Sequence, residues 1–329
     1  MKHSPIVVIH GISDLGEIPE IQAVTFDISV RCAPNLKMLR DALPGADVLL
    51  SWHFQASELE QSWDSADQLR WIQWGGAGVD AVLFPAVVHS DVVLTNMRGI
   101  FDQAIAEYVL GLILAFAKDF PETYNAQRER RWSHRFTNRI RGCEVLVIGT
   151  GGIGRAIGGI LRAVGCQVRG VGRTARSGDD VFSIIYSTTD LDRVLENSDY
   201  VVAAIPLTSE TRGLFGAKQF ALMKKEARFI NVGRGALVDE SALVNALEEQ
   251  QISGAALDVF KIEPLPHDSA LWNLNNVIIS PHMSGDYNGH KAAMARLFLD
   301  NLRLFRLDQP LLNRIDKKLG FISSNLDPN

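Results

Sequence analysis

The sequence predicts an α/β protein built from two doubly wound, mostly parallel β-sheets. Three observations lead to this fold class. The chain has 329 residues, which is longer than a domain with a single hydrophobic core usually is. Its residues are 47% hydrophobic, which is enough to fill two cores. Short apolar runs alternate with amphipathic segments up to about Asn96, and a second, more regular alternation begins at Glu144. Strand, helix, strand in this order is typical of a parallel sheet covered on both faces.

The first alternation predicts four strands and two helices. The expected strands are the apolar runs 6–10, 47–52, 71–74 and 92–95. The expected helices are the amphipathic segments 35–43 and 57–69. One long helix should follow over 101–130. Because apolar residues cover much of its circumference, we expect it to be buried between domains or between subunits.

The second alternation predicts a sheet of the nucleotide-binding type. The expected strands are 145–148, 168–171, 200–204, 229–232 and 277–280, with a helix starting at Ile153. A last amphipathic segment, 286–307, is long enough to return the chain to the first domain. The predicted domains are therefore 1–97 plus 288–329, and 98–287 inserted between them.

Net charge, the length of the apolar runs and the spacing of the cysteines argue against several kinds of partner and site. The formal net charge is −5 and no run of Lys or Arg occurs, which argues against nucleic acid or an anionic membrane as the main partner. The longest apolar stretch, 108–117, has half the length of a membrane span, and the run 6–9 is too short for a signal-peptide core. The three cysteines are far apart and read as reduced thiols, and we expect no metal site. The expected location is the cytoplasm.

A glycine turn follows the first strand of the second alternation. It reads Gly149-Thr-Gly151-Gly152-Ile153-Gly154 and opens a helix that runs to about Val164. The first glycine permits a tight turn, the second lets backbone N–H groups approach a pyrophosphate, and the third lets the helix pack closely on the strand. The positive end of the helix dipole then favours that anion. The turn predicts a dinucleotide-binding domain of Rossmann type.

The end of the next strand predicts which dinucleotide binds. An NAD site normally has Asp or Glu there, whereas this strand ends in Gly172-Arg173-Thr174-Ala-Arg176. Arg173 can hold a 2′-phosphate through its planar guanidinium and Thr174 can donate its hydroxyl, while no carboxylate repels the phosphate at that position. We therefore expect NADP(H) as the preferred cofactor, with NAD(H) still accepted. The alternative is that Arg173 and Arg176 are solvated loop charges.

Three further segments follow predicted strands of the same domain. They are Asn231-Val232-Gly233-Arg234-Gly, then Ala256-Leu-Asp258-Val-Phe-Lys-Ile-Glu263-Pro, and then Ser280-Pro-His282-Met-Ser-Gly285. With these motifs the chain resembles the D-isomer-specific 2-hydroxyacid dehydrogenase family, whose members carry an Arg, a Glu and a His in these contexts. The resemblance extends to Trp74-Gly-Gly76-Ala77-Gly78-Val-Asp, to Ala106-Glu-Tyr108 and to Pro206-Leu-Thr-Ser-Glu-Thr211.

The chemistry of the three side chains fits reduction of a ketone. Hydride addition leaves an alkoxide, so a proton donor must lie within hydrogen-bond reach, and His282 is the expected donor. Glu263 should hydrogen-bond the far ring nitrogen and orient the imidazole. Arg234 stays cationic and can bind the substrate carboxylate or polarise its carbonyl. Each of the three could instead be a structural loop residue. His10 is among the other histidines for which we identify no partner.

The resemblance implies further roles. It gives a flavodoxin-like substrate-binding domain that carries the inserted Rossmann domain, a D product and a homodimer, to which the apolar helix near 101–117 would contribute. It places Asp258 near the nicotinamide carboxamide. Further cofactor contacts are expected at Pro206, Thr211, Val232, Gly233 and Gly285. From the residues themselves, the substrate carboxylate should meet the backbone N–H groups of Gly76, Ala77 and Gly78. Trp52 and His53 stand at a strand end and are candidates to line the pocket; the alternative is that the aromatic side chain belongs to the core.

The expected function is reduction of a small 2-keto acid, such as glyoxylate or hydroxypyruvate, to a D-2-hydroxy acid with NADPH. The small 2-keto or 2-hydroxy acid is the expected small-molecule partner. Two alternatives stay open at this point. One is a phosphonate dehydrogenase of the same fold. The other is a non-catalytic NAD(P)-sensing binding protein of the same fold, which would bind NADPH without consuming it.

Overall fold

The computed structural model describes residues 4–23, 28–53 and 57–322. The chain divides into two compact units, and we describe each by itself. The discontinuous unit comprises Met1–Phe101 and Tyr287–Asn329, and the inserted unit comprises Asp102–Asp286. Within the described ranges, no helix is both long and apolar enough to cross a membrane.

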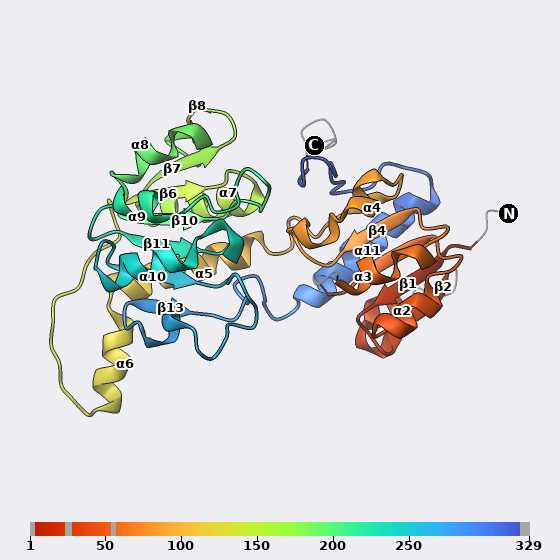
Figure 1. The fold of residues 1–329 in the computed structure, drawn as a ribbon, viewed down its shortest axis with the longest axis horizontal. Helices are drawn as coiled ribbons and strands as arrows, with labels where there is room; N and C mark the ends of the chain where they lie inside the picture. Colours follow the sequence, from red (N-terminus) through yellow and green to blue (C-terminus); the bar gives the residue numbers. More distant parts are fainter. Residues whose placement is uncertain (1–3, 24–27, 54–56, 323–329) are drawn as a thin grey trace. The chain divides into compact units, whose positions relative to one another are not determined.

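The discontinuous unit contains a parallel sheet of five strands in the order β2-β1-β3-β4-β5 (Figure 1). The strands are β1 (Ile6–His10), β2 (Ser29–Ala33), β3 (Val48–Ser51), β4 (Trp71–Trp74) and β5 (Val93–Thr95). The helices are α1 (Pro19–Gln22), α2 (Leu36–Ala42), α3 (Ser57–Ser62), α4 (Pro85–His89) and α11 (His290–Arg306), with short 3₁₀ turns η1 (Leu15–Glu17), η3 (Trp63–Ser65) and η4 (Asp80–Val82). This strand order is the flavodoxin-like one, which confirms the predicted fold class.

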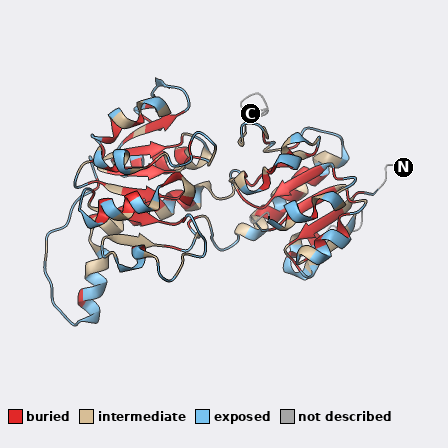
Figure 2. Ribbon diagram, viewed as in Figure 1, coloured by how far each residue is buried: buried red, intermediate tan, exposed pale blue. Residues whose placement is uncertain are grey.

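Side chains of successive residues in β1 enter two different cores. Val8 packs with residues of α2, α3 and α4 on one face of the sheet. Val7 and Ile9 pack with residues of α1 and α11 on the other face. Because both faces are covered, the central strands β1, β3 and β4 are mostly apolar and almost completely buried, and Figure 2 shows this burial. The apolar runs therefore predicted four of the five strands, whereas the partly exposed edge strand β2 has no continuous apolar run and was missed.

The inserted unit contains an eight-stranded sheet in the order β13-β12-β11-β10-β6-β7-β9-β8. The strands are β6 (Glu144–Ile148), β7 (Gln167–Gly172), β8 (Arg176–Ser177), β9 (Ile184–Ser187), β10 (Tyr200–Ala203), β11 (Arg228–Asn231), β12 (Gly254–Leu257) and β13 (Val277–Ile279). All neighbouring strands are parallel except the β8–β9 hairpin. The order reverses between β6 and β10, which is the Rossmann arrangement.

Helices cover this sheet as well. They are α5 (Asp102–Ala117), α6 (Phe120–Arg128), α7 (Gly152–Ala163), α8 (Leu191–Leu195), α9 (Ala217–Ala221) and α10 (Glu240–Glu248), with 3₁₀ turns η5 (Thr188–Asp190), η6 (Gly235–Leu237) and η7 (Ala270–Asn273). Residues of α8, α9 and α10 share one core with the strands. Helices α5 and α7 pack against each other, and Gly154 of α7 abuts Val147 of β6.

The prediction of one helix over 101–130 is wrong, because α5 and α6 are separate helices. The chain turns at Asp119, whose φ of 52° lies in the left-handed region, and Pro121 near the start of α6 cannot donate a backbone hydrogen bond. The apolar residues on which the prediction rested, from Ile105 to Phe116, all lie within α5. Residues on one side of α5, including Ile105, Val109 and Leu112, are buried.

Candidate active site

Three chemically active side chains follow three neighbouring strands of the inserted unit. Arg234 lies three residues after β11, Glu263 lies in the segment after β12, and His282 lies three residues after β13. These strands are adjacent and parallel, so their carboxyl ends meet at one edge of the sheet. Ligands of open α/β sheets bind at this edge.

Glu263 and His282 form a hydrogen-bonded pair. Oε2 of Glu263 lies 2.7 Å from Nδ1 of His282, and Oε1 accepts a hydrogen bond of 2.9 Å from the backbone N–H of Phe260. Both carboxylate oxygens are thus engaged, so the carboxylate fixes the orientation of the imidazole. The side chains are 28% exposed for His282 and 31% for Glu263, which leaves the pair accessible to a small molecule.

The surroundings favour the ionised form of Glu263. Burial alone would raise the pKa of this carboxyl group. The hydrogen bonds from His282 and from Phe260 N–H, with the nearby charges of His282 and Arg234, outweigh burial and lower the pKa below its ordinary value. Arg234 is therefore close enough to act electrostatically on the pair.

Arg234 is held by its own loop. Its Nη1 donates a hydrogen bond of 2.8 Å to the oxygen of Gly233, and its backbone oxygen accepts one of 3.0 Å from Asn231 Nδ2. A side chain at Gly235 would collide with the backbone of Phe260, so the loop after β11 lies directly against the loop after β12. Glycine at 235 permits this close approach and brings Arg234 toward Glu263.

Asp258 organises the turn that carries His282. Its side chain is completely buried. Oδ1 accepts hydrogen bonds from Ser280 Oγ at 2.7 Å and from Met283 N–H at 2.9 Å, and Oδ2 accepts one of 2.9 Å from Ser284 N–H. Sequence reasoning missed this role, because the motif around Asp258 gives no sign of partners more than twenty residues away. A contact to the nicotinamide stays a prediction.

The glycine turn has the geometry that the sequence argument requires. Gly149 has a φ of +110°, and a side chain at this position would collide with the backbone oxygen of Ala204, which follows β10. The strand order of the sheet reverses between β6 and β10. At Gly154 an added Cβ would lie 1.8 Å from the oxygen of Gly149, so helix and strand are as close as backbones allow. At Gly151, the N-cap of α7, an added Cβ would meet nothing within 4 Å. The open side of Gly151 and the start of α7 fit the pyrophosphate of a dinucleotide.

Other predicted cofactor residues lie on the same edge. Val232 and Gly233 follow β11 directly, and Gly285 ends the turn of His282. Pro206 follows β10, and the hydroxyl of Thr211 donates to the oxygen of Pro206 at 2.7 Å while accepting from Thr208 N–H at 2.8 Å. Thr211 therefore shapes this loop, and its contact to a cofactor stays a prediction. Gly152 and Ile153 begin α7.

Arg173, Thr174 and Arg176 follow β7 and are exposed. Arg176 begins β8, which pairs with β9 in a short antiparallel hairpin. The two arginines and the threonine are therefore presented on an edge of the sheet next to the glycine turn, since β7 is the neighbour of β6. Their contact to a 2′-phosphate stays a prediction.

The predicted substrate residues of the discontinuous unit lie at the carboxyl ends of β3 and β4. Trp52 follows β3 and is 8% exposed, and the ring of His53 packs on Gly11 after β1. The carbonyl oxygens of Gly76, Ala77 and Gly78 accept hydrogen bonds from Met97 N–H, Asn96 and Trp74. Within residues 4–23, 28–53 and 57–322, the N–H groups of these three residues donate to no protein acceptor.

One titratable pair was missed at the same edge. His10, at the end of β1, is 3% exposed, and its Nε2 lies 2.7 Å from Oε2 of Glu58 in α3. The statement that His10 has no identifiable partner is therefore wrong. The two residues are 48 positions apart, and no local pattern links them.

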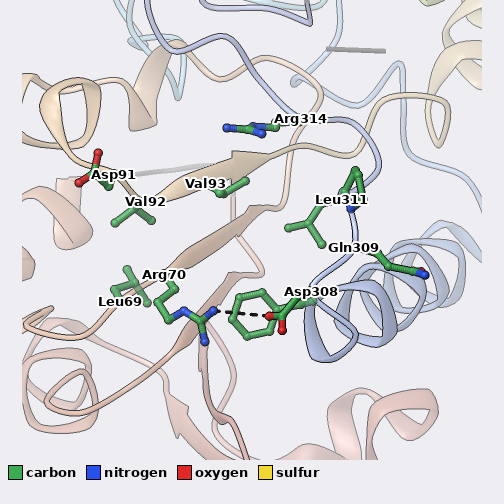
Figure 3. A pocket seen from close by; sticks show the side chains of 11 residues that line it. Leu69, Arg70, Asp91, Val92, Val93, Asp308, Gln309, Leu311 and Arg314 are labelled. Atoms are coloured by element: carbon green, nitrogen blue, oxygen red, sulfur yellow. Dashed lines mark ion pairs between the residues drawn. The ribbon is translucent and has the colours of Figure 1, made fainter. Parts of the chain in front are cut away.

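Two cavities lie away from these residues. One of about 540 Å³ in the discontinuous unit is bordered by Arg70, Asp91, Asp308 and Arg314 (Figure 3). Nη2 of Arg70 lies 3.9 Å from Oδ1 of Asp308. One of about 550 Å³ in the inserted unit is bordered by residues that precede β11, β12 and β13. None of the predicted site residues borders either cavity. Among the described residues, no cluster of three His, Cys, Asp or Glu could hold a metal ion.

Comparisons with known proteins identify the family. The model of the family "D-isomer specific 2-hydroxyacid dehydrogenase, NAD binding domain" matches residues 110–284, which is more than half of the chain. Glyoxylate/hydroxypyruvate reductase B of Salmonella newport is 35% identical over 232 residues, covering 68% of this chain and 71% of the relative.

Solved structures extend the likeness over almost the whole chain. A D-isomer specific 2-hydroxyacid dehydrogenase of Xanthobacter autotrophicus, in complex with NADPH and MES, has a TM-score of 0.84 at 32% identity and covers 97% of this chain and 100% of its own. An NADPH-dependent glyoxylate/hydroxypyruvate reductase of Sinorhizobium meliloti, in complex with NADP and sulfate, has a TM-score of 0.85 at 26% identity, with 97% and 100% covered. The chain belongs to the D-isomer specific 2-hydroxyacid dehydrogenase family and is an NAD(P)-dependent 2-hydroxyacid dehydrogenase.

Proposed function

We propose that this enzyme reduces small 2-keto acids to D-2-hydroxy acids with NADPH, and that glyoxylate and hydroxypyruvate are among its substrates. The observation that carries the proposal is the Glu263–His282 pair beside Arg234 at the carboxyl edge of the sheet. A proton donor fixed by a carboxylate, with a cation nearby, is what the reduction of a keto acid needs.

Each of the three side chains has a defined task. When bound, the nicotinamide cofactor supplies the hydride that reduces C2. His282 donates a proton to the carbonyl oxygen and takes it back in the reverse direction. Glu263 keeps the imidazole oriented through Nδ1, so that the other ring nitrogen serves the substrate. Arg234 binds the carboxylate or polarises the carbonyl and thereby stabilises the negative charge that develops on oxygen.

The inserted unit is the proposed dinucleotide-binding domain. Gly149, Gly151 and Gly154 with the start of α7 would hold the pyrophosphate, and Asp258 would lie near the carboxamide. Arg173, Thr174 and Arg176 would hold the 2′-phosphate, which favours NADPH over NADH. Two relatives whose structures contain NADPH or NADP, at 32% and 26% identity, support this preference.

The discontinuous unit is the proposed substrate-binding domain. The backbone N–H groups of Gly76, Ala77 and Gly78 have no acceptor among the described residues, and a substrate carboxylate would provide one. Trp52 would contribute an apolar wall. The Salmonella relative, named for glyoxylate and hydroxypyruvate, supports small 2-keto acids as the substrate class.

The test is the loss of nicotinamide absorbance with NADPH and NADH separately. The acids would be glyoxylate, hydroxypyruvate, pyruvate and phenylpyruvate. We expect turnover that favours NADPH and the smaller acids. The variant His282→Ala should lose roughly 10³-fold in kcat while binding NADPH as before, whereas the exposed His267→Ala should behave like the wild type. Binding of NADPH without turnover of any acid would instead support the non-catalytic sensing protein.

We also propose that the enzyme is a homodimer. The segment after α6 exposes Trp132 and Phe136 almost completely, at 100% and 98%. An ion pair holds this segment against the start of α6, because Nε of Arg135 lies 2.6 Å from Oδ2 of Asp119. Two exposed aromatic side chains on a segment that is fixed by an ion pair are suited to pack against a second copy of the chain. Trp132→Ser combined with Phe136→Ser should therefore give monomers in sedimentation equilibrium, whereas Trp272→Ser, at a half-exposed site, should not.

A further inference from the structure

Arg155 in the first turns of α7 binds two neighbouring carboxylates. Its Nη1 donates to Oδ2 of Asp179 at 2.6 Å and its Nη2 donates to Oδ1 of Asp180 at 2.7 Å. The two aspartates lie on the loop between β8 and β9, three and four residues after Arg176. No role in the proposed reaction is assigned to Arg155, Asp179 or Asp180.

This ion pair fixes the tip of the loop between β8 and β9, which directly follows the predicted phosphate residues Arg173, Thr174 and Arg176 in the sequence. Oδ1 of Asp179 accepts hydrogen bonds from the N–H groups of Val181 and Phe182, at 2.8 and 2.9 Å. Phe182 is fully buried, and added Cβ atoms at Gly158 of α7 and Gly170 of β7 would meet its ring. The loop is thus anchored to α7 by Phe182 at its base and by Arg155 at its tip.

The ionised form of Asp179 is strongly favoured. Its pKa is lowered, first by the hydrogen bond from Phe182 N–H and then by the one from Arg155. Substitution of Arg155 would remove the cation that both carboxylates bind and leave them without this partner on the loop.

The number of charged side chains near the predicted phosphate residues sets the sign of the electrostatic potential there. The segment 173–183 contains Arg173, Arg176, Asp179 and Asp180, so this segment alone carries no net charge. With Arg155 the group becomes net positive. A 2′-phosphate with two negative charges gains from this difference, whereas NADH has no phosphate at that position.

We propose that Arg155 is a positioning residue for cofactor selection: by binding Asp179 and Asp180 it keeps their carboxylates from opposing a 2′-phosphate at Arg173 and Arg176. The inference rests on the proposed use of NADPH. Arg155 acts through the aspartates and does not touch the phosphate itself. In an NAD site, an acidic residue at the end of the strand that corresponds to β7 would repel a 2′-phosphate, and β7 has no such residue. The next acidic residues along the chain are Asp179 and Asp180, and Arg155 neutralises them.

Arg162 offers a matched control on the same helix. It lies two turns further along α7 and reaches the same loop, but its Nη1 meets only the backbone oxygen of Asp179, at 3.5 Å. Arg162→Met removes an equal charge from α7 without releasing a carboxylate. The comparison separates the release of Asp179 and Asp180 from a general loss of positive charge.

The experiment measures dissociation constants of NADPH and NADH by nicotinamide fluorescence, without substrate. Arg155→Met should raise the Kd of NADPH about tenfold and leave that of NADH unchanged. Arg155→Lys should retain most of the affinity for NADPH. In the variant that combines Arg155→Met with Asp179→Asn and Asp180→Asn, the affinity for NADPH should return, because no carboxylate remains. Melting temperatures without cofactor show whether each variant is folded.

The outcomes separate this inference from the proposed function. If the wild type prefers NADPH and Arg155→Met leaves the ratio of the two constants unchanged, Arg155 has no part in selection and the proposed function stands. If the wild type has no preference but Arg155→Met shifts the ratio toward NADH, the proposed preference fails and the role of Arg155 stands. Loss of NADPH affinity that the two Asn substitutions do not restore, or an equal loss in Arg162→Met, overturns the inference.

Discussion

The backbone N–H of His282 donates a hydrogen bond of 2.8 Å to the backbone oxygen of Asp258. The Asp258 carboxylate accepts from Met283 and Ser284 N–H, so three successive residues are bound to one aspartate. His282 has a φ of 53°, in the left-handed region that side chains other than glycine rarely adopt. The hydrogen bonds of Asp258 offset the cost of this conformation and set the direction in which the imidazole points.

Substitution of Asp258 should damage both stability and catalysis. Asp258→Ala leaves three donors without an acceptor, two of them backbone N–H groups, and we expect a loss of about 3 kcal/mol in the free energy of unfolding. Asp258→Asn can still accept at the Oδ1 position and should lose only the hydrogen bond from Ser284, so its loss should be smaller. Thermal melting and kcat of both variants provide the measurement.

The exposed Asp268→Asn is the control for this prediction, because it changes the same charge in the same unit without any buried hydrogen bond. If Asp258→Ala melts like the wild type, Asp258 does not hold the turn of His282.

The contribution of Glu263 to stability should depend on pH in a defined direction. Its folded-state pKa is lowered below the ordinary value of 4.5, because hydrogen bonds and nearby positive charges outweigh burial. Its ionised form therefore stabilises the fold fully above that value, and the stabilisation is lost as the pH falls through the folded-state pKa. The difference in melting temperature between wild type and Glu263→Gln should be positive near neutrality and shrink by about pH 3. A difference that grows on acidification contradicts the assignment.

Substitution of Arg234 should act on the keto acid. Arg234→Met removes a cation that can bind a carboxylate through two hydrogen bonds, and we expect KM to rise about 100-fold with a lower kcat. Arg234→Lys keeps the charge but loses the planar geometry, so the rise should be roughly tenfold. Initial rates at varied concentrations of keto acid measure both.

Arg228→Met is the matched control, since Arg228 begins β11 at the opposite end of the strand from the loop of Arg234. An equal rise of KM in Arg228→Met would mean that the effect is not specific to the site.

Three glycines, the N-cap Gly151 and Gly154 and Gly159 of α7, should respond differently to the same substitution. Gly154→Ala forces a methyl group against the oxygen of Gly149 and should cost about 2 kcal/mol of stability. At Gly151 the backbone has a φ of −78° and space is open, so Gly151→Ala should fold normally but bind NADPH roughly tenfold more weakly. Gly159→Ala, also in open space within the helix, should stabilise by about 0.5–1 kcal/mol. Melting curves and NADPH titrations measure the series, and equal NADPH binding by all three contradicts the assigned turn.

Much of the fold follows from local patterns. Buried parallel strands such as β1, β3 and β4 are mostly apolar, because both faces of the sheet are covered, and the sequence predicts them to within a residue or two. The edge strand β2 was missed since half-exposed residues break the run. The break between α5 and α6 was missed because Asp119 adopts a left-handed conformation that the hydrophobic pattern does not record.

The sequence by itself determined the fold class, the glycine turn and the candidate residues at strand ends. These depend on residue type and on short spacings, such as glycine where a backbone approaches closely. Only the tertiary structure decided which side chains meet. Glu263 finds His282 nineteen positions away, and Arg155 finds Asp179 twenty-four away. Such pairs form because neighbouring parallel strands end at one edge of the sheet, or because a loop folds back on a helix, and spacing along the chain does not encode either contact.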